Sequence, residues 1–222
     1  MFSEIWFKMD EDIAVINSNT RKEKIKNFLI NNKKSLLYFS GSILILILFF
    51  FGYKSYDESK IKKISDEYNS AVIGYSQLNK DKTKDILINI INKKNATYST
   101  LSLYFIIDNK LIESKDETNK LFDILIDKTS LDEEIRYLII YKKGLFNADN
   151  SNENELLKIL DPIIKSNSIW KSHSLYLMAE FYYNKNEKQK AKEFFEKILT
   201  LENSNMDIAK KTQIRLNRDL SD

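Results

Sequence analysis

The chain of 222 residues has no cysteine, one proline and only four glycines. The missing cysteines exclude disulfide bonds, thiol catalysis and thiolate metal sites. Strands and tight turns depend on glycine and proline, so a chain this poor in both is predicted to be all-α. Two of the four glycines, Gly41 and Gly52, lie inside the longest apolar run, which leaves even fewer for the rest of the chain.

Charge is missing from one long run, residues 35–53 (SLLYFSGSILILILFFFGY), although charged residues make up 30% of the chain. At a rise of ~1.5 Å per residue, a helix over this run spans roughly 28 Å, close to the ~30 Å hydrocarbon core of a bilayer. Lys33, Lys34 and Lys54 flank the run, as headgroup anchors do. A buried helix of a soluble domain seldom lacks a polar stripe over such a length. The run is therefore predicted to be a transmembrane helix.

A cleaved signal peptide is the other interpretation of a basic segment that precedes an apolar run. However, 34 residues precede this run, and Phe51-Gly52-Tyr53-Lys54 offers no small-x-small cleavage pattern. We therefore expect an uncleaved signal anchor. It divides the chain into an N-terminal tail (1–34), a transmembrane helix (35–53) and a C-terminal domain (54–222).

Basic residues on the two sides of the run predict its orientation. Six lie shortly before the run and four shortly after it: Arg21, Lys22, Lys24, Lys26, Lys33 and Lys34, then Lys54, Lys60, Lys62 and Lys63. This bias favours a cytoplasmic N-terminus and an exported C-terminal domain. Residues 21–34 fit either an interfacial amphipathic helix, with Ile25, Phe28 and Leu29 on one face, or a plain solvated helix that leads into the span.

The composition of the C-terminal domain argues against several classes of function. Of 35 basic and 32 acidic residues, seven and five lie in the tail, which leaves a nearly neutral domain with 28 and 27. A nucleic-acid partner normally requires a basic excess, so none is expected. There is no Gly-rich phosphate loop, no His-Glu-x-x-His and no Gly-x-Ser-x-Gly, and His173 is the single histidine. We therefore expect no enzyme activity, no metal, no cofactor and no small-molecule substrate.

Apolar residues in the domain recur at spacings of three and four, which predicts a series of helices. Their expected ranges are 54–78, 82–94, 97–113, 116–128, 131–147, 153–165, 169–184, 187–201 and 205–219. Ser130, with Glu133 three residues later, has the spacing of a capping box for one of them.

Short polar turns between helices of this length indicate stacked antiparallel hairpins. The last pair has the size pattern of a tetratricopeptide repeat, with small residues where the two helices cross and aromatic residues beside the crossing. The pattern consists of Leu175, Met178, Ala179 and Tyr182, followed by Ala191, Phe195 and Ile198. Weaker copies begin near Leu101 and Tyr137, so about three degenerate repeats are expected, with residues 205–219 as a closing helix.

Short motifs over nearly the full length resemble the YfgM-like inner-membrane proteins of Gram-negative bacteria. They are Met9-Asp10-Glu11-Asp12-Ile13 ahead of the basic segment and the span, Asn95-Ala96-Thr97-Tyr98 at the start of a repeat, and Leu160-Asp161-Pro162-Ile163 with Ile169-Trp170-Lys171 before the last repeat. The chain is rich in Lys, Asn and Ile, whereas typical members are rich in Ala.

The resemblance implies a tetratricopeptide repeat-like α-solenoid in the periplasm, held by one helix in the inner membrane. It also implies an adaptor or chaperone-like role at the SecYEG translocon, with membrane-anchored periplasmic chaperones of the PpiD type and emerging exported chains as partners. The other reading is a structural or regulatory scaffold for a different cell-envelope complex. Binding of unfolded exported chains distinguishes the adaptor from the scaffold, which would bind one folded partner.

Partner-binding residues are expected on the helix over 169–184, opposite its packing face. His173, Tyr176, Glu180 and Tyr183 follow one stripe at i, i+3, i+7 and i+10. Tyrosine suits the recognition of varied chains because it offers a large contact area at low entropic cost. Ordinary packing between neighbouring repeats explains the same stripe equally well.

Overall fold

The computed structural model describes residues 20–220, apart from the side chains of Leu36 and Tyr53. Within this range the chain is helical with short connections and has no strand, which confirms the all-α prediction. The chain divides into two compact units between Lys60 and Ile61. The motif at residues 9–13 lies outside the described range.

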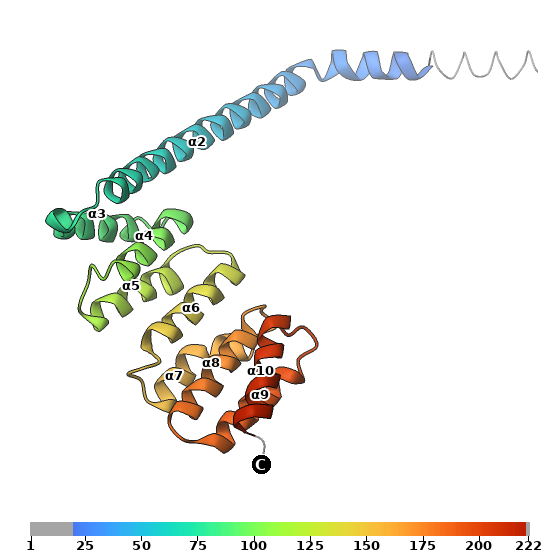
Figure 1. Cartoon of the computed structure of the whole chain (residues 1–222). Coiled ribbons are helices and arrows are strands. Elements are labelled where there is room, and N and C mark those ends of the chain that lie inside the picture. The colour runs from blue at the N-terminus through green and yellow to red at the C-terminus, as the bar shows by residue number, and fades with distance from the viewer. Residues whose placement is uncertain (1–19, 221–222) are drawn as a thin grey trace, which may run out of the picture. The chain divides into compact units, whose positions relative to one another are not determined.

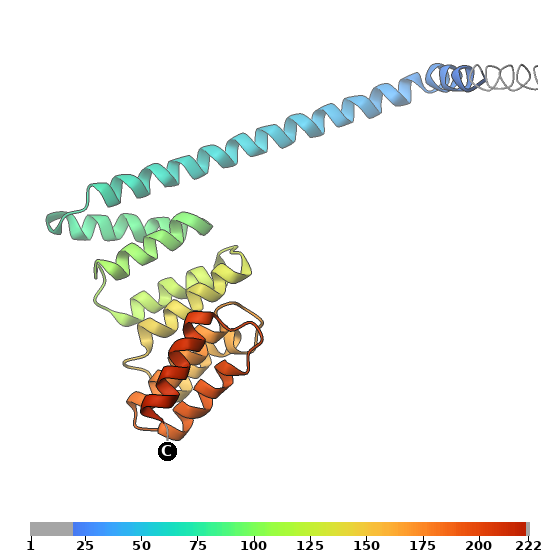
Figure 2. The same cartoon turned by 45° about the vertical axis from the view of Figure 1, so that its right-hand side comes forward.

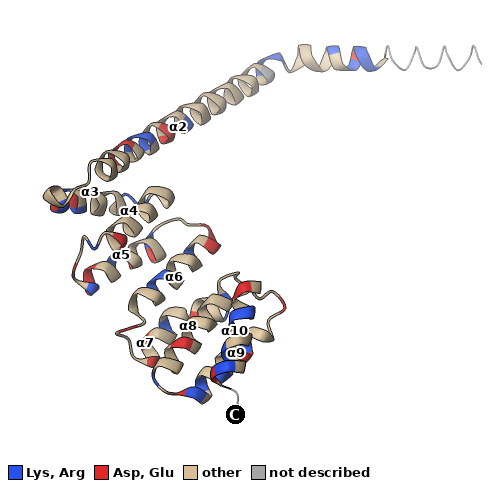
Figure 3. Ribbon diagram, viewed as in Figure 1, with Lys and Arg blue, Asp and Glu red and all other residues tan. Residues whose placement is uncertain are grey.

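The first unit contains the apolar run. A helix over residues 20–31 ends at a turn, and α2 (Lys33–Ile73) then begins and continues into the second unit. Among the described helices, α2 alone is long and apolar enough to cross a membrane, and its most apolar stretch is not buried inside the protein. Figure 3 shows this stretch of α2 without charged residues, whereas the helix before it carries several basic ones.

The second unit consists of the end of α2 and a succession of helices, each of which packs against the next (Figures 1 and 2). These elements are the 3₁₀ turn η1 (Gln77–Asn79), α3 (Lys80–Asn92), α4 (Ala96–Asp108), α5 (Lys115–Lys128), α6 (Glu133–Asn147), α7 (Glu153–Ile164), α8 (Lys171–Asn184), α9 (Lys188–Leu199) and α10 (Met206–Asp219). Most of them match a predicted helix closely, but two predicted helices end early. The helix predicted to reach 78 ends at Ile73, and the one predicted to reach 113 ends at Asp108.

The early end of α4 has a local cause. Lys110 adopts a left-handed backbone conformation with φ of 50°, and the N–H of Leu111 turns back to the carbonyl of Ile106 at 2.9 Å. Lys94 and Asn186 have the same conformation just after α3 and α8. Glycine usually occupies this position at the end of a helix. In this glycine-poor domain, lysine and asparagine residues take it instead.

The predicted cap at Ser130 is wrong. The N-cap of α6 is Asp132, whose carboxylate accepts a hydrogen bond from the N–H of Glu134 at 3.0 Å. Thr129 ends α5 in an extended conformation, so Ser130 lies in the connection and α6 starts later than predicted. An aspartate at this position also complements the positive end of the helix dipole.

The residues of the size pattern in α8 and α9 are buried, as predicted. Ala179 and Ala191 have no exposed surface, and Phe195 beside them has none either. Gly144 plays a similar part in α6, because a Cβ atom there would lie only 2.6 Å from Cδ2 of Leu160 in α7. Small residues therefore let neighbouring helices approach closely at both places.

Candidate functional site

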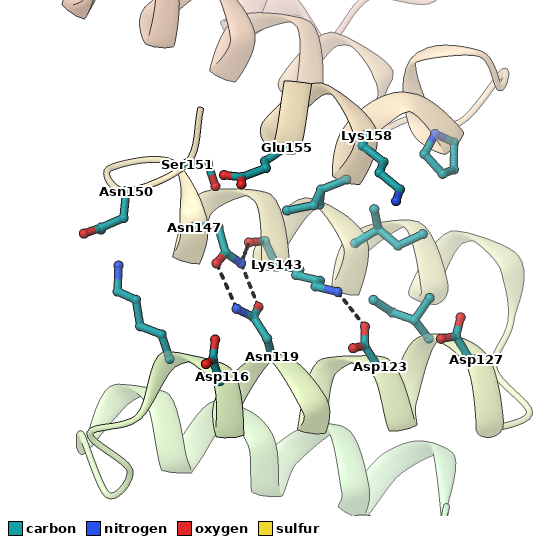
Figure 4. A pocket seen from close by; sticks show the side chains of 15 residues that line it. Asp116, Asn119, Asp123, Asp127, Lys143, Asn147, Asn150, Ser151, Glu155 and Lys158 are labelled. Carbon is teal, nitrogen blue, oxygen red and sulfur yellow. Dashed lines mark hydrogen bonds and ion pairs between the residues drawn. The ribbon is translucent and has the colours of Figure 1, made fainter. Parts of the chain in front are cut away.

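A groove lies between α5 and α7, with α6 as its floor (Figure 4). Its volume is about 640 Å³. It is lined by side chains from all three helices and from the connection between α6 and α7. The polar lining residues are Lys115, Asp116, Asn119, Asp123, Asp127, Lys143, Asn147, Asn150, Ser151, Glu155 and Lys158, and the apolar ones are Ile126, Ile140, Ile159 and Pro162. We call this site the α5–α7 groove.

Two paired amides join α5 to the floor of the groove. Nδ2 of Asn119 donates to Oδ1 of Asn147 at 3.0 Å, and Nδ2 of Asn147 donates back to Oδ1 of Asn119 at 2.8 Å. The same Asn147 nitrogen also donates to the carbonyl of Lys143 at 2.8 Å. These bonds orient both amides, while each amide oxygen keeps a lone pair with which to accept a further hydrogen bond.

An ion pair joins the same two helices further along the groove. Nζ of Lys143 lies 2.5 Å from Oδ1 of Asp123. The Lys143 side chain is only 18% exposed, so this ion pair is largely shielded from water on the lysine side. Asp116 and Asp127 continue the acidic side of α5 and are exposed to solvent. The α5 side of the groove therefore offers carboxylate acceptors, and the floor provides one neutralising cation.

The α7 side of the groove contains an unusual feature of the backbone. Pro162 lies inside α7 and has no N–H group, so the carbonyl of Lys158 lacks its normal intrahelical donor. Pro162 and Lys158 both line the groove. Glu155 forms a capping box with Asn152 at the start of the same helix, with both hydrogen bonds at 3.0 Å. The Glu155 carboxylate therefore already accepts a hydrogen bond from the backbone N–H of Asn152.

Taken together, the α5–α7 groove offers hydrogen-bond acceptors, charges of both signs and isoleucine side chains. Groups of this kind bind a polar chain with apolar side groups, such as an extended polypeptide, through hydrogen bonds and burial of apolar surface. Within residues 20–220, no three or more His, Asp or Glu side chains are placed to hold a metal ion.

The sequence contains a signal for this groove in the polar residues of α5. Asp116, Asn119, Asp123 and Asp127 recur at i, i+3, i+7 and i+11 along α5. Such a stripe of short polar residues resembles an ordinary solvated helix face. Only the position of α7 opposite the stripe turns it into one wall of a groove.

The residues predicted to bind partners lie together on α8 and are all partly buried. His173 contacts the rings of Trp170 and Tyr141, with centroid distances of 5.1 and 5.8 Å. Burial lowers the pKa of His173 below its usual range, so the ring favours its neutral form. Tyr176 packs edge-on against Phe195 at 5.4 Å.

The other two residues of the predicted stripe contact the last helix. The guanidinium of Arg215 in α10 donates to both oxygens of Glu180, at 2.7 and 2.5 Å. It also lies 4.2 Å above the ring of Tyr183 and bonds to Asp219. Burial, followed by the hydrogen bond to Glu180, raises the pKa of Tyr176 to about 12. Much of this stripe is therefore engaged by α10.

Comparison with known proteins does not identify a family: no family model, no curated protein and no solved structure shows a significant match to the chain.

Proposed function

We propose that the chain is a membrane-anchored adaptor that binds protein partners through a tetratricopeptide repeat-like domain. The observation that carries the proposal is the α5–α7 groove, on a helical domain that follows a helix able to cross a membrane. A tether of this kind holds a binding domain at high effective concentration beside a membrane-bound complex. Catalysis plays no part in the proposed role.

The buried size pattern supports the repeat assignment. In α8 and α9, the small Ala179 and Ala191 are buried together with the aromatic Tyr182 and Phe195, which agrees with the spacing of a tetratricopeptide repeat. Gly144 is a small residue where α6 packs closely against α7, one hairpin earlier. Repeat arrays present extended surfaces to partners, which agrees with an adaptor role.

We further propose that α2 is a signal anchor in the inner membrane, with the domain in the periplasm and the Sec translocon as its neighbour. Orientation rests on the six basic residues before the run against four after it. The translocon, a chaperone of the PpiD type and exported chains as partners rest on the resemblance of the short motifs to the YfgM-like proteins.

In-cell photocrosslinking tests the proposal. A photoreactive residue is placed at Asp127, which is exposed at the edge of the groove. Further probes are placed at Tyr176 and Tyr183 on the predicted stripe and at Leu46 in α2. Glu196, exposed on α9 and away from the groove, is the matched control. We expect translocon subunits from Leu46, and chaperones or exported chains from Asp127 but not from Glu196.

Other results of the same experiment have definite meanings. A single folded envelope protein captured from Asp127 would favour the scaffold reading over the adaptor. Equal capture from Asp127 and Glu196 would remove the groove as the binding site. Cytoplasmic proteins captured from the domain would overturn the orientation.

A further inference from the structure

The helix over residues 20–31 exposes an apolar face that packs against nothing described in the structure. Ile25, Phe28 and Leu29 are 60%, 59% and 49% exposed. At 3.6 residues per turn these three side chains fall within an arc of about 100°. An apolar arc of this width is typical of a helix that buries one face against another element. In this helix, however, the apolar face is exposed.

Basic residues border this apolar arc. Lys22 and Lys24 fall on either side of the arc, and Arg21 falls within it one turn before Ile25. Long cationic side chains in such positions can lay their aliphatic stems on apolar surface and extend the charge outward. Glu23 and Asn27 lie on the opposite side of the helix, with the exposed Ile30 next to Glu23. The helix thus combines an apolar centre, basic flanks and a mostly polar back.

The helix over residues 20–31 ends directly before α2. Both the backbone N–H and the side-chain amide of Asn32 donate to the carbonyl of Phe28 at 3.0 Å, and α2 begins at Lys33. The turn at Asn32 interrupts the helix, so the segments before and after it need not share an axis. Since the apolar run of α2 follows directly, a bilayer that holds this run also places the helix at its surface.

We propose that residues 20–31 form an interfacial helix that binds the anionic headgroups of the bilayer crossed by α2. The apolar face enters the boundary between headgroups and acyl chains, and the basic flanks contact lipid phosphates. The inference rests on the proposed membrane anchoring by α2 and adds a second, peripheral contact with the same membrane.

The absence of cysteine makes the test direct, because single cysteines can be placed and labelled in the full chain. An environment-sensitive fluorophore goes at Ile25 or Leu29 on the apolar face, at Glu23 or Asn27 on the polar back, and at Leu46 in the span. The full chain is reconstituted into vesicles of phosphatidylcholine alone or mixed with phosphatidylglycerol, and quenching by neutral acrylamide is measured.

With phosphatidylglycerol present, we expect severalfold weaker quenching at positions 25 and 29 than at 23 and 27. Equal quenching at all four positions, with Leu46 still protected, would overturn the inference while leaving the anchor intact. An unprotected Leu46 would overturn the membrane anchor itself. Protection of 25 and 29 that is equally strong in phosphatidylcholine alone would refute the role given to anionic headgroups.

A charge variant completes the test. Lys22→Gln with Lys24→Gln should remove most of the protection at position 29 in anionic vesicles. Lys62→Gln with Lys63→Gln, two exposed lysines beyond the span, is the matched control and should change nothing. Equal effects of the two double variants would contradict the proposed contact.

Discussion

Replacement of Gly144 by alanine tests how tightly α6 packs against α7 and α8. A Cβ atom at this buried position would lie 2.6 Å from Cδ2 and 3.2 Å from Cγ of Leu160, and 3.5 Å from Cδ2 of Leu177. Leu160 has no exposed surface, so it has no open space into which to move. Overpacking of a core usually costs about 1–3 kcal/mol.

A second effect has the opposite sign, because alanine favours a helix interior over glycine by about 1 kcal/mol. The steric cost should prevail, since the new atom crowds the branch point of Leu160 as well as one of its methyl groups. We expect Gly144→Ala to lower the free energy of unfolding by about 1 kcal/mol, within a range of roughly 0–2. In a domain of this size, this loss lowers Tm by about 2–4 °C.

The assay is thermal and denaturant unfolding of the full chain in detergent, followed by circular dichroism. Gly144→Ala combined with Leu160→Val should be more stable than the sum of the two single changes predicts, because valine lacks the Cδ atoms that meet the new methyl group. Asn89→Ala on the exposed face of α3 is the control and should gain up to about 0.7 kcal/mol. If Gly144→Ala melts above the natural chain, Leu160 relaxes freely and the reasoning is refuted.

Three further predictions follow from individual contacts. Glu180→Gln should lower the free energy of unfolding of α10 by about 1.5–3 kcal/mol, because Arg215 loses a charged acceptor. Hydrogen exchange of the α10 amides should therefore become faster, and unchanged exchange would contradict this prediction. Burial raises the pKa of Tyr104 to about 12, so the folded protein should lose stability as the pH rises from 10 towards 12. The Tyr104→Phe variant should lose less stability over this pH range, as measured by thermal unfolding at each pH. Lys110→Gly should raise the free energy of unfolding by up to about 1 kcal/mol, because glycine adopts the left-handed conformation of this position without strain. Lys120→Gly inside α5 is the control and should lower the free energy of unfolding by about the same amount. If both variants are less stable than the natural chain, Lys110 is not strained.

The helices of the second unit were predictable because each depends mainly on local signals. Apolar spacing placed α3 and α5 to α10 within a few residues of their observed ends, and the scarcity of glycine and proline excluded strands. The end of α4 was missed because lysine gives no warning of a left-handed conformation; Lys110 adopts it where the chain must turn back to Ile106. The cap at Asp132 was missed because Ser130 has an equally good local pattern, and only the course of the connection selects between them.

The predicted stripe on α8 and the α5–α7 groove both depend on contacts between residues far apart in the chain. The predicted stripe on α8 does lie on one face, since helical periodicity alone decides that. Its engagement by α10 depends on Arg215, which meets Glu180 across 35 residues of sequence. The α5–α7 groove likewise required α7 to lie opposite Asp116 and Asp127, which no spacing within α5 reveals.

The sequence by itself determined the all-helical class, the helix over residues 35–53 that is apolar enough to cross a membrane, and the small residues at helix crossings. Composition, periodicity and side-chain size act over one or two turns and can be read directly from the chain. The tertiary structure alone decided which polar faces stay open and which are covered, because a face is covered only when a distant helix packs against it. It therefore formed the α5–α7 groove and joined Glu180 to Arg215.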